Sequence, residues 1–419
     1  MSSSWLDTRL GEVLTLQRGF DLPADDRRPG RFPVVASTGI AGTHCEPMVK
    51  GPGVVIGRSG SIGGAQYVTG DFWPLNTTLW VKDFKGNDRR FCYYLLKSLD
   101  LQTFNVGSGV PTLNRNHVHP LPVRIPADVN EQRAIAYVLG TLDDKIELNR
   151  RMNETLEAMA RALFKSWFID FDPVHAKAEG RNPGLPTDIV ALFPDSFQES
   201  NLGEIPKGWA VRSLGELIKT VKGCSYTSDD LVDSDTALVT LKSFARGGGY
   251  RPDGLKSFAG PYKPEQLVTP GELVIACTDV TQAAAVIGRT AVVRGTTRYR
   301  TLVASLDTLI VRPNSQDMTR SFLYFLGRTD DFVAHTYSHT TGTTVLHLAK
   351  EAVPSFAFAL PPAQLVREFD SLANPVLSRI EASDEQSETI AILRDALLPK
   401  LLSGELRISS MRQRAEVKS

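Results

Sequence analysis

Residues 135–167 read IAYVLGTLDDKIELNRRMNETLEAMARALFKSW, and this stretch decides the fold. Its seam positions follow one another in alternating steps of four and three, the pattern of a helix that packs along another helix. Asp128 precedes the stretch as a candidate N-cap, with Glu131 three residues later. The sequence predicts one long helix over residues 128–168 with the seam residues Ile135, Leu139, Leu142, Ile146, Asn149, Asn153, Leu156, Ala160, Leu163 and Trp167.

A second stripe of the same form lies 234 residues later and predicts a helix over residues 362–402. The polar interruption of the first stripe is kept, as two serines. Such narrow stripes favour packing of the two helices on each other, and the alternative is that each helix packs on its own globular region. Pro375 and Pro399 are expected to kink or break the second helix. Its seam residues are Phe369, Ala373, Val376, Ile380, Ser383, Ser387, Ile390, Arg394, Leu397 and Leu401.

The region before each long helix is duplicated as well. Near its start the second copy follows the first by 204 residues, as Trp5 and Trp209 show, and near its end by 233, as Gly109 and Gly342 show. A single jump between these offsets implies roughly 30 extra residues inside the second copy. Two long copies indicate a duplication, since a solenoid needs at least three similar units.

Each duplicated region has the pattern of a mixed α+β unit. Alternating apolar residues at 121–125 and 356–360 predict an edge strand that leads into each long helix. Further patterns predict strands at 54–57 and 273–276 and helical pieces at 91–99 and 319–327. The proline-rich segment between the halves is expected to be a surface linker. The predicted parts are two globular regions, 1–127 and 201–361, two helices, 128–168 and 362–402, a linker, 169–200, and a tail, 403–419.

The charge distribution is more informative than the net charge, which is zero. Residues 1–127 hold 14 Lys/Arg against 10 Asp/Glu, and residues 201–361 hold 17 against 15, whereas residues 169–200 hold 2 against 6. This weak positive excess on the two globular regions falls well short of a strongly basic DNA-binding domain. Four dispersed cysteines, no membrane-length apolar run and no signal sequence fit a protein of the reducing cytoplasm.

No catalytic motif emerges from the sequence. It lacks a phosphate-binding loop, a dinucleotide fingerprint, a nucleophile elbow and a zinc-binding helix, which favours binding over catalysis, and no metal site is expected. Polar and basic side chains of the types that contact bases and phosphates instead gather in glycine-rich stretches. The alternative for each stretch is a flexible turn or a plain polar loop. The candidate nucleic-acid contacts are Arg58, Ser59, Ser61, Asn114, Arg115, Asn116, His117, Lys222, Lys242, Arg246, Thr278, Gln282, Thr341, Thr343 and His347.

Several phrases of the chain resemble the specificity subunits of type I restriction–modification systems. They are NEQRAI at 130–135, LDDKIELN at 142–149, LFKSWF at 163–168 with DFDP at 170–173, GEIPKGW at 203–209 and LLPKLLSGEL at 397–406. The resemblance covers nearly the whole chain and is specific in the helices and the linker. One departure is the start of the second helix, which reads PPAQLV where the family usually has a Glu-Gln start.

This resemblance implies two target recognition domains, 1–127 and 201–361, each reading one half of a bipartite target in double-stranded DNA. It also implies that the long helices form an antiparallel coiled-coil spacer and dock two methyltransferase (modification) subunits, to which restriction subunits add. S-adenosylmethionine, ATP and Mg would then belong to the partner subunits, and this chain would carry no cofactor and no catalytic residue. The rival hypotheses are a stand-alone nuclease or methyltransferase with unfamiliar motifs, and a coiled-coil scaffold that binds only protein.

Overall fold

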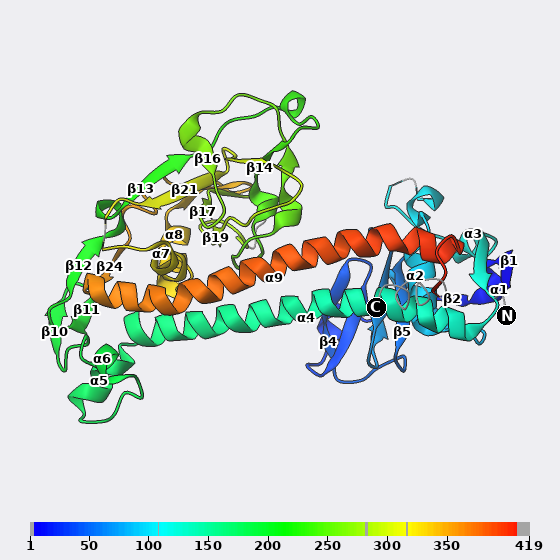
Figure 1. The fold of residues 1–419 in the computed structure, drawn as a ribbon, viewed down its shortest axis with the longest axis horizontal. Coiled ribbons are helices and arrows are strands. Elements are labelled where there is room, and N and C mark those ends of the chain that lie inside the picture. The colour runs from blue at the N-terminus through cyan, green and yellow to red at the C-terminus, as the bar shows by residue number, and fades with distance from the viewer. Residues whose placement is uncertain (1–3, 108, 281–283, 316, 409–419) are drawn as a thin grey trace, which may run out of the picture. The chain divides into compact units, whose positions relative to one another are not determined.

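The computed structural model describes residues 4–107, 109–280, 284–315 and 317–408. The chain is α+β, as the sequence predicts, and divides into two compact units. Unit 1 comprises residues 1–148 and 387–419, and unit 2 comprises residues 149–386. Helix α4 (Val129–Phe168) and helix α9 (Ala363–Ser403) each contribute to both units. Each unit thus contains one globular region and a segment of both long helices (Figure 1).

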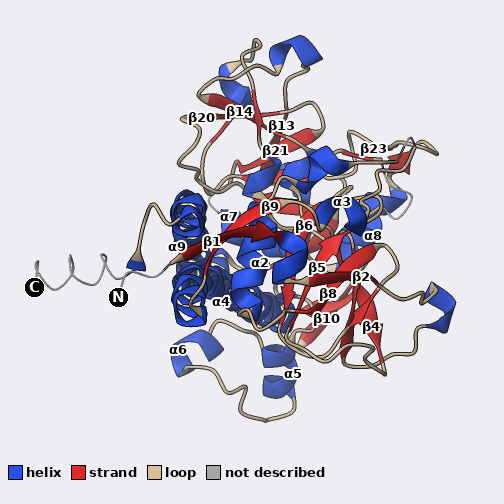
Figure 2. Cartoon of the chain, turned by 90° about the vertical axis from the view of Figure 1, so that its right-hand side faces the viewer, coloured by secondary structure: helices blue, strands red, loops and turns tan. Residues whose placement is uncertain are grey.

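Unit 1 is built on an antiparallel four-stranded sheet, whose strands appear in Figure 2. In spatial order these strands are β2 (Thr15–Arg18), β8 (Thr78–Asp83), β5 (Gly53–Gly57) and β6 (Gly63–Val68). A second sheet has the order β4 (Gly39–His44), β3 (Phe32–Ala36) and β7 (Trp73–Pro74), in which β3 and β7 are parallel. The first strand, β1 (Trp5–Arg9), pairs with β9 (Pro122–Pro126). The short helices are α1 (Leu10–Val13), α2 (Arg89–Ser98) and α3 (Arg115–Val118).

Unit 2 repeats this topology with additions. Its main sheet has the order β13 (Ile218–Lys222), β21 (Thr308–Pro313), β17 (Leu273–Ala276) and β19 (Thr290–Val292). The second sheet consists of β15 (Lys256–Ser257), β14 (Thr236–Val239), β20 (Thr301–Ala304) and β16 (Leu267–Val268). The strand pair is β12 (Ala210–Ser213) with β24 (Ala357–Leu360), and a small sheet comprises β18 (Thr278–Asp279), β23 (Leu346–Leu348) and β22 (Thr340–Thr341). Helices α7 (Arg320–Leu326) and α8 (Asp330–Ser338) follow β21.

The duplication is real, but the extra residues of the second copy do not enter at one point. Strands β3 and β14 begin 204 residues apart, at Phe32 and Thr236. The next equivalent pair, β5 and β17, begins 220 residues apart, and β8 and β21 begin 230 apart. The expected single jump is therefore wrong. Insertions lie in two separate connections, where added length disturbs the sheets little.

The predicted helix pair is confirmed and is antiparallel. In unit 2, Asn149 Nδ2 donates to Ser383 O at 3.2 Å and to Gln386 Oε1 at 3.0 Å. One turn later, Asn153 Nδ2 donates to Ile380 O at 3.4 Å and to Asp384 Oδ1 at 2.7 Å. The residue numbers of the partners on α9 fall as those on α4 rise, so the two helices run in opposite directions. The polar interruption of the seam is thus a set of cross-helix hydrogen bonds, which favours one register over others.

The predicted seam residues are all buried or half-buried. In unit 1, Ile135 and Leu139 of α4 share a core with Leu398 and Leu401 of α9. In unit 2, an aromatic cluster that includes Phe164, Trp167 and Phe369 fills the same role. The first helix begins as expected, because Asp128 Oδ1 accepts the Asn130 N–H at 2.9 Å.

The breaks expected as one possible effect of two prolines in the second helix do not occur. Helix α9 runs without interruption through Pro375 and Pro399. Both prolines are exposed, so water can satisfy the carbonyl groups that lose their helical partner.

The segment 169–200 is also more structured than a surface linker. It contains α5 (Asp172–Ala178), α6 (Thr187–Val190) and β10 (Phe197–Ser200), which pairs with β11 (Gly203–Pro206). Its side chains Val174 and Phe193 are buried in the core of unit 2, and the Phe193 ring lies 5.5 Å from that of Trp167. Pro173 lies in the first turn of α5, where a backbone N–H would have no partner within the helix, so proline costs no hydrogen bond there.

Candidate nucleic-acid interface

A polar cleft of about 700 Å³ lies at one end of the main sheet of unit 1. It is lined by residues from the end of β2, from the turn after β5 and from the loop before α3. Two of these segments are joined through backbone hydrogen bonds, from Leu113 N to Arg58 O at 2.7 Å and from Gly60 N to Pro111 O at 3.0 Å. The lining residues are Gln17, Arg18, Gly19, Phe20, Asp21, Arg58, Leu79, Val106, Thr112, Leu113, Asn114, Arg115 and Asn116.

The side chains of this cleft are mostly cationic or amide-bearing. Arg18 forms an exposed ion pair with Asp21 at 3.5 Å, and Arg58 Nη1 donates to Asn76 O at 3.3 Å. Asn114 caps α3, because its Oδ1 accepts the Asn116 N–H at 3.0 Å. Three guanidinium groups against one carboxylate give the cleft a positive excess that the whole chain lacks.

Unit 2 has a cleft of about 340 Å³ with a related construction. Thr278 and His347 face each other across the β18–β23 pair, and Thr278 Oγ1 donates to Asp307 Oδ1 at 2.8 Å. Burial raises the pKa of the Cys277 thiol to about 12, so this cysteine is not a thiolate nucleophile at neutral pH. The lining residues are Thr220, Lys222, Cys277, Thr278, Leu309, His347, Leu348, Ala349 and Lys350.

The two clefts occupy equivalent places in the duplicated fold. Both include the last residue of the strand at one edge of the main sheet, which is Arg18 in β2 and Lys222 in β13. Each also includes a leucine of the neighbouring strand, the segment after β5 or β17, and the loop that precedes the edge strand β9 or β24. Two sets of residues that diverge in type are thus placed by the same topology at the same site.

The structure brings together about half of the residues predicted as contacts. The first cleft contains Arg58, Asn114, Arg115 and Asn116, and the second contains Lys222, Thr278 and His347. Two others lie beside a cleft, since Ser59 forms a bridge with Thr112 and Thr341 pairs with His347. Neither cleft is lined by Ser61, His117, Lys242, Arg246 or Thr343. The remaining candidate, Gln282, lies outside the described residues.

Several lining residues are not among those that the sequence predicts. They include Gln17 and Arg18 in the first cleft and Thr220 and Lys350 in the second. The signal for Arg18 was present, because Arg18-Gly19 matches Lys222-Gly223 in the repeat and Lys222 was already a candidate. Lys350 follows a loop whose length differs between the copies, so no repeat position pointed to it.

Other chemistry finds no support in the described part of the chain. No group of three or more His, Cys, Asp or Glu side chains there could hold a metal ion. His119, in the sequence His117-Val-His119, uses its Nε2 to accept the Leu16 N–H at 3.0 Å. No helix among the described residues is both long and apolar enough to cross a membrane.

Comparison with known proteins gives a consistent result. Residues 2–158 match the model of the type I restriction modification DNA specificity domain. The MjaIX specificity subunit of Methanocaldococcus jannaschii is 26% identical over 81% of this chain and 74% of its own length. The HindI specificity subunit of Haemophilus influenzae is 23% identical over 71% of each chain. A crystal structure of the S subunit from M. genitalium covers 96% of both chains with a TM-score of 0.56 at 15% identity, which shows the same fold. Residues 2–158 thus match the specificity domain, and over most of its length the chain is similar to type I restriction–modification specificity subunits.

Proposed function

We propose that this chain is the non-catalytic DNA-recognition subunit of a type I complex and that each globular region reads one half of a bipartite target. The observation that carries this proposal is the pair of clefts at equivalent places in the two duplicated units. A duplicated fold with two equivalent reading sites is suited to two half-sites. Since the fold fixes where each cleft lies, the side chains within it are free to diverge.

The residue types in the clefts support base and phosphate contacts. Arginine pairs with guanine and asparagine or glutamine with adenine in the major groove, each pair contributing about 1–3 kcal/mol of discrimination. By strand register and backbone hydrogen bonds, Arg58 of the first cleft corresponds to Cys277 of the second, and Thr112 corresponds to His347. Different side chains at matched positions imply different half-sites.

The long helices are proposed to be the spacer and the docking surface for methyltransferase subunits. Large apolar side chains are exposed on α4 at Tyr137, Leu148 and Met159, and on α9 at Leu372, Ile392 and Leu393. Exposed apolar side chains along a helix are suited to burial against another protein. Methyl transfer, ATP use and cleavage would then reside in partner subunits, together with S-adenosylmethionine, ATP and Mg.

The test is to co-express the chain with its methyltransferase subunit and map methylated adenines across a host genome. One two-part motif with a fixed gap is expected. Arg58→Ala combined with Arg115→Ala should abolish recognition of one half-site only, and Lys222→Ala should weaken the other. Arg31→Ala is a matched control, because Arg31 is an exposed arginine of unit 1 that stacks on Phe32 and does not line the cleft.

The proposal fails in either of two ways. A soluble assembled complex without any sequence-dependent methylation would favour a protein scaffold. Methyl transfer by the isolated chain would instead favour a stand-alone enzyme.

A further inference from the structure

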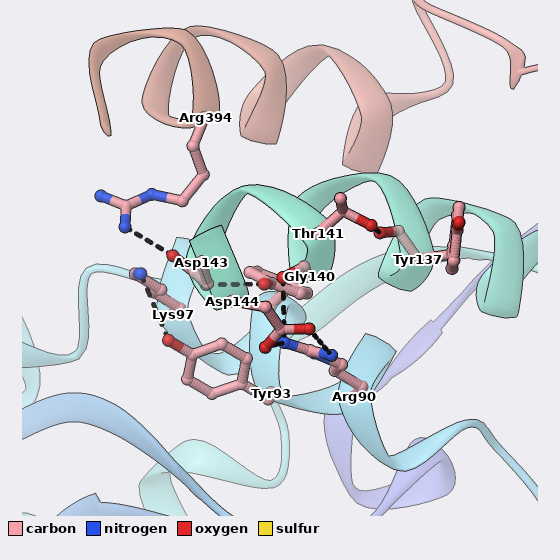
Figure 3. A network of polar contacts seen from close by, with 10 residues as sticks. Arg90, Tyr93, Lys97, Tyr137, Gly140, Thr141, Asp143, Asp144 and Arg394 are labelled. Atoms are coloured by element: carbon pink, nitrogen blue, oxygen red, sulfur yellow. Dashed lines mark hydrogen bonds and ion pairs between the residues drawn. The ribbon is translucent and has the colours of Figure 1, made fainter. Parts of the chain in front are cut away.

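A buried polar network ties helix α2 to both long helices inside unit 1 (Figure 3). Its centre is the carboxylate of Asp143 on α4. Tyr94 OH, from α2, donates to Asp143 Oδ2 at 2.6 Å, and Arg394 Nη1, from α9, donates to Asp143 Oδ1 at 2.6 Å. The Asp143 and Arg394 side chains are only 20% and 16% exposed, so solvent screens this ion pair weakly.

Further contacts hold α2 against α4. Arg90 forms a bidentate ion pair with Asp144 and donates from Nη2 to Gly140 O at 3.1 Å. A Cβ at position 140 would lie 2.5 Å from Arg90 Cζ, so glycine is what allows the guanidinium to lie against α4.

The protonation states suit this arrangement. Burial raises the pKa of Tyr94, and its bond to Asp143 raises it further, so the phenol remains a donor. Burial lowers the pKa of Arg394, but its hydrogen bonds to Asp143 and Asp395 outweigh that effect and leave the pKa raised. Removing one member would therefore leave a buried group without its partner, which is costly.

Unit 2 contains the same device made from different residues. Helix α7 takes the place of α2, and Tyr324 OH donates to Glu157 Oε1 of α4 at 2.7 Å. Arg328 Nη2 lies 3.1 Å from the same carboxylate oxygen. The Arg328 side chain is 13% exposed and that of Glu157 is 21% exposed. The carboxylate comes from α4 in both units, whereas the arginine comes from α9 in one and from the globular region in the other.

Only a short connection separates each of these helices from a strand that lines a reading cleft. Strand β8 carries the cleft residue Leu79 and ends at Asp83, and Asp88 caps α2 through a bond from Phe91 N at 2.9 Å. Strand β21 carries Leu309 and is followed by α7, which Thr319 caps. A helix that is fixed to the long helices therefore also fixes the strand that forms the wall of the cleft.

We propose that Asp143 with Tyr94 and Arg394, and Glu157 with Tyr324 and Arg328, are positioning residues that hold each reading cleft at a set orientation on the helix pair. They determine how strictly the assembled complex measures the gap between half-sites. This inference rests on the proposed function. It adds that gap discrimination depends on the rigidity of these two attachments as well as on helix length.

The experiment uses the complex of the full chain with its methyltransferase subunits. Methylation rates are measured on DNA with the native gap and with the gap one base pair shorter or longer. Tyr94→Phe, Arg394→Gln and Asp143→Asn should each lower the ratio of native-gap to altered-gap rate by about threefold to tenfold, a range typical of coupling between contacting residues. The base preferences within each half-site should not change.

The controls separate positioning from stability and from the proposed function. Glu46→Gln removes an exposed ion pair to Arg28 within the globular region and should leave the ratio unchanged. Tyr94→Phe changes only a hydroxyl, so it remains informative even where Asp143→Asn fails to fold. An unaltered gap ratio in an assembled Tyr94→Phe complex overturns the inference. A wild-type complex with no gap preference overturns the proposed function as well.

Discussion

At the scale of single residues, the repeated glycines have a steric explanation. A Cβ at Gly19 would lie 2.2 Å from Leu75 O, and one at Gly223 would lie 2.2 Å from Ser305 O. Gly19→Ala should lower the free energy of unfolding of unit 1 by about 2–4 kcal/mol, because backbone must move to admit the methyl group. Urea denaturation measures this, with Gly70→Ala as the control, since a Cβ added there would have no atom within 4 Å beyond its chain neighbours. Equal stability of the two variants would refute the steric argument.

His119 provides a prediction about pH. Burial lowers its pKa, with Arg115 and Lys85 adding to the effect, and its neutral Nε2 accepts the Leu16 N–H. A histidine whose pKa is lower in the folded state contributes stability above its unfolded pKa of about 6.5 and loses it as the pH falls below that value. Wild type should therefore lose more thermal stability between pH 7.5 and pH 5 than His119→Gln, whose amide oxygen can accept the same bond. Identical losses would assign the acid sensitivity to other groups.

The predicted contact residues show what the sequence could predict at this scale. Arg58 and Asn114 were predicted because they stand in polar, glycine-rich loops, and both line the first cleft. Lys242 and Arg246 have the same side-chain character but lie outside the second cleft, because loop position alone does not say to which end of a sheet a loop returns. Composition predicted a kind of residue, and topology decided which of these residues meet.

At the scale of elements, the long helices were the most predictable part. Their period is a local property of the sequence, so Ile135 through Trp167 could be placed on one face without knowing the fold. The segment 169–200 was misjudged because its prolines indicate turns, whereas Val174 and Phe193 are buried through contacts that only the tertiary structure provides.

The helix seam gives a prediction at the same scale. Ile380 is 3% exposed and its carbonyl accepts a bond from Asn153. Ile380→Asp should destabilise unit 2 by about 3 kcal/mol or more, because it places an unpaired charge in the seam. Ala382→Asp, at an exposed position of the same helix, should cost about 0.7 kcal/mol or less. Chemical denaturation of both variants tests this, and similar costs at the two positions would argue against a helix–helix seam.

At the scale of the whole molecule, duplication explains both what is shared and what differs. The order β2-β8-β5-β6 recurs as β13-β21-β17-β19, and a parallel pair recurs in the second sheet of each unit. These pairings join residues far apart in sequence, so neither order could be deduced from local patterns. The repeat showed that two copies exist, while the sheets show where the second copy absorbs its insertions.

The net charge of the chain is zero, so the salt dependence of its DNA affinity is predicted from the cationic side chains in the clefts. Five cationic side chains line the two clefts, namely Arg18, Arg58, Arg115, Lys222 and Lys350. If the clefts hold the DNA, log K for the isolated chain should fall with log[salt] with a slope no steeper than about −4.5, since each neutralised phosphate contributes about −0.9. Arg58→Ala should reduce the slope by about 0.9 if this arginine contacts phosphate, and should instead relax one base preference if it reads a base. A slope near −10 for the isolated chain would place most phosphate contacts outside the clefts, whereas a steeper slope only after assembly would assign them to the partner subunits.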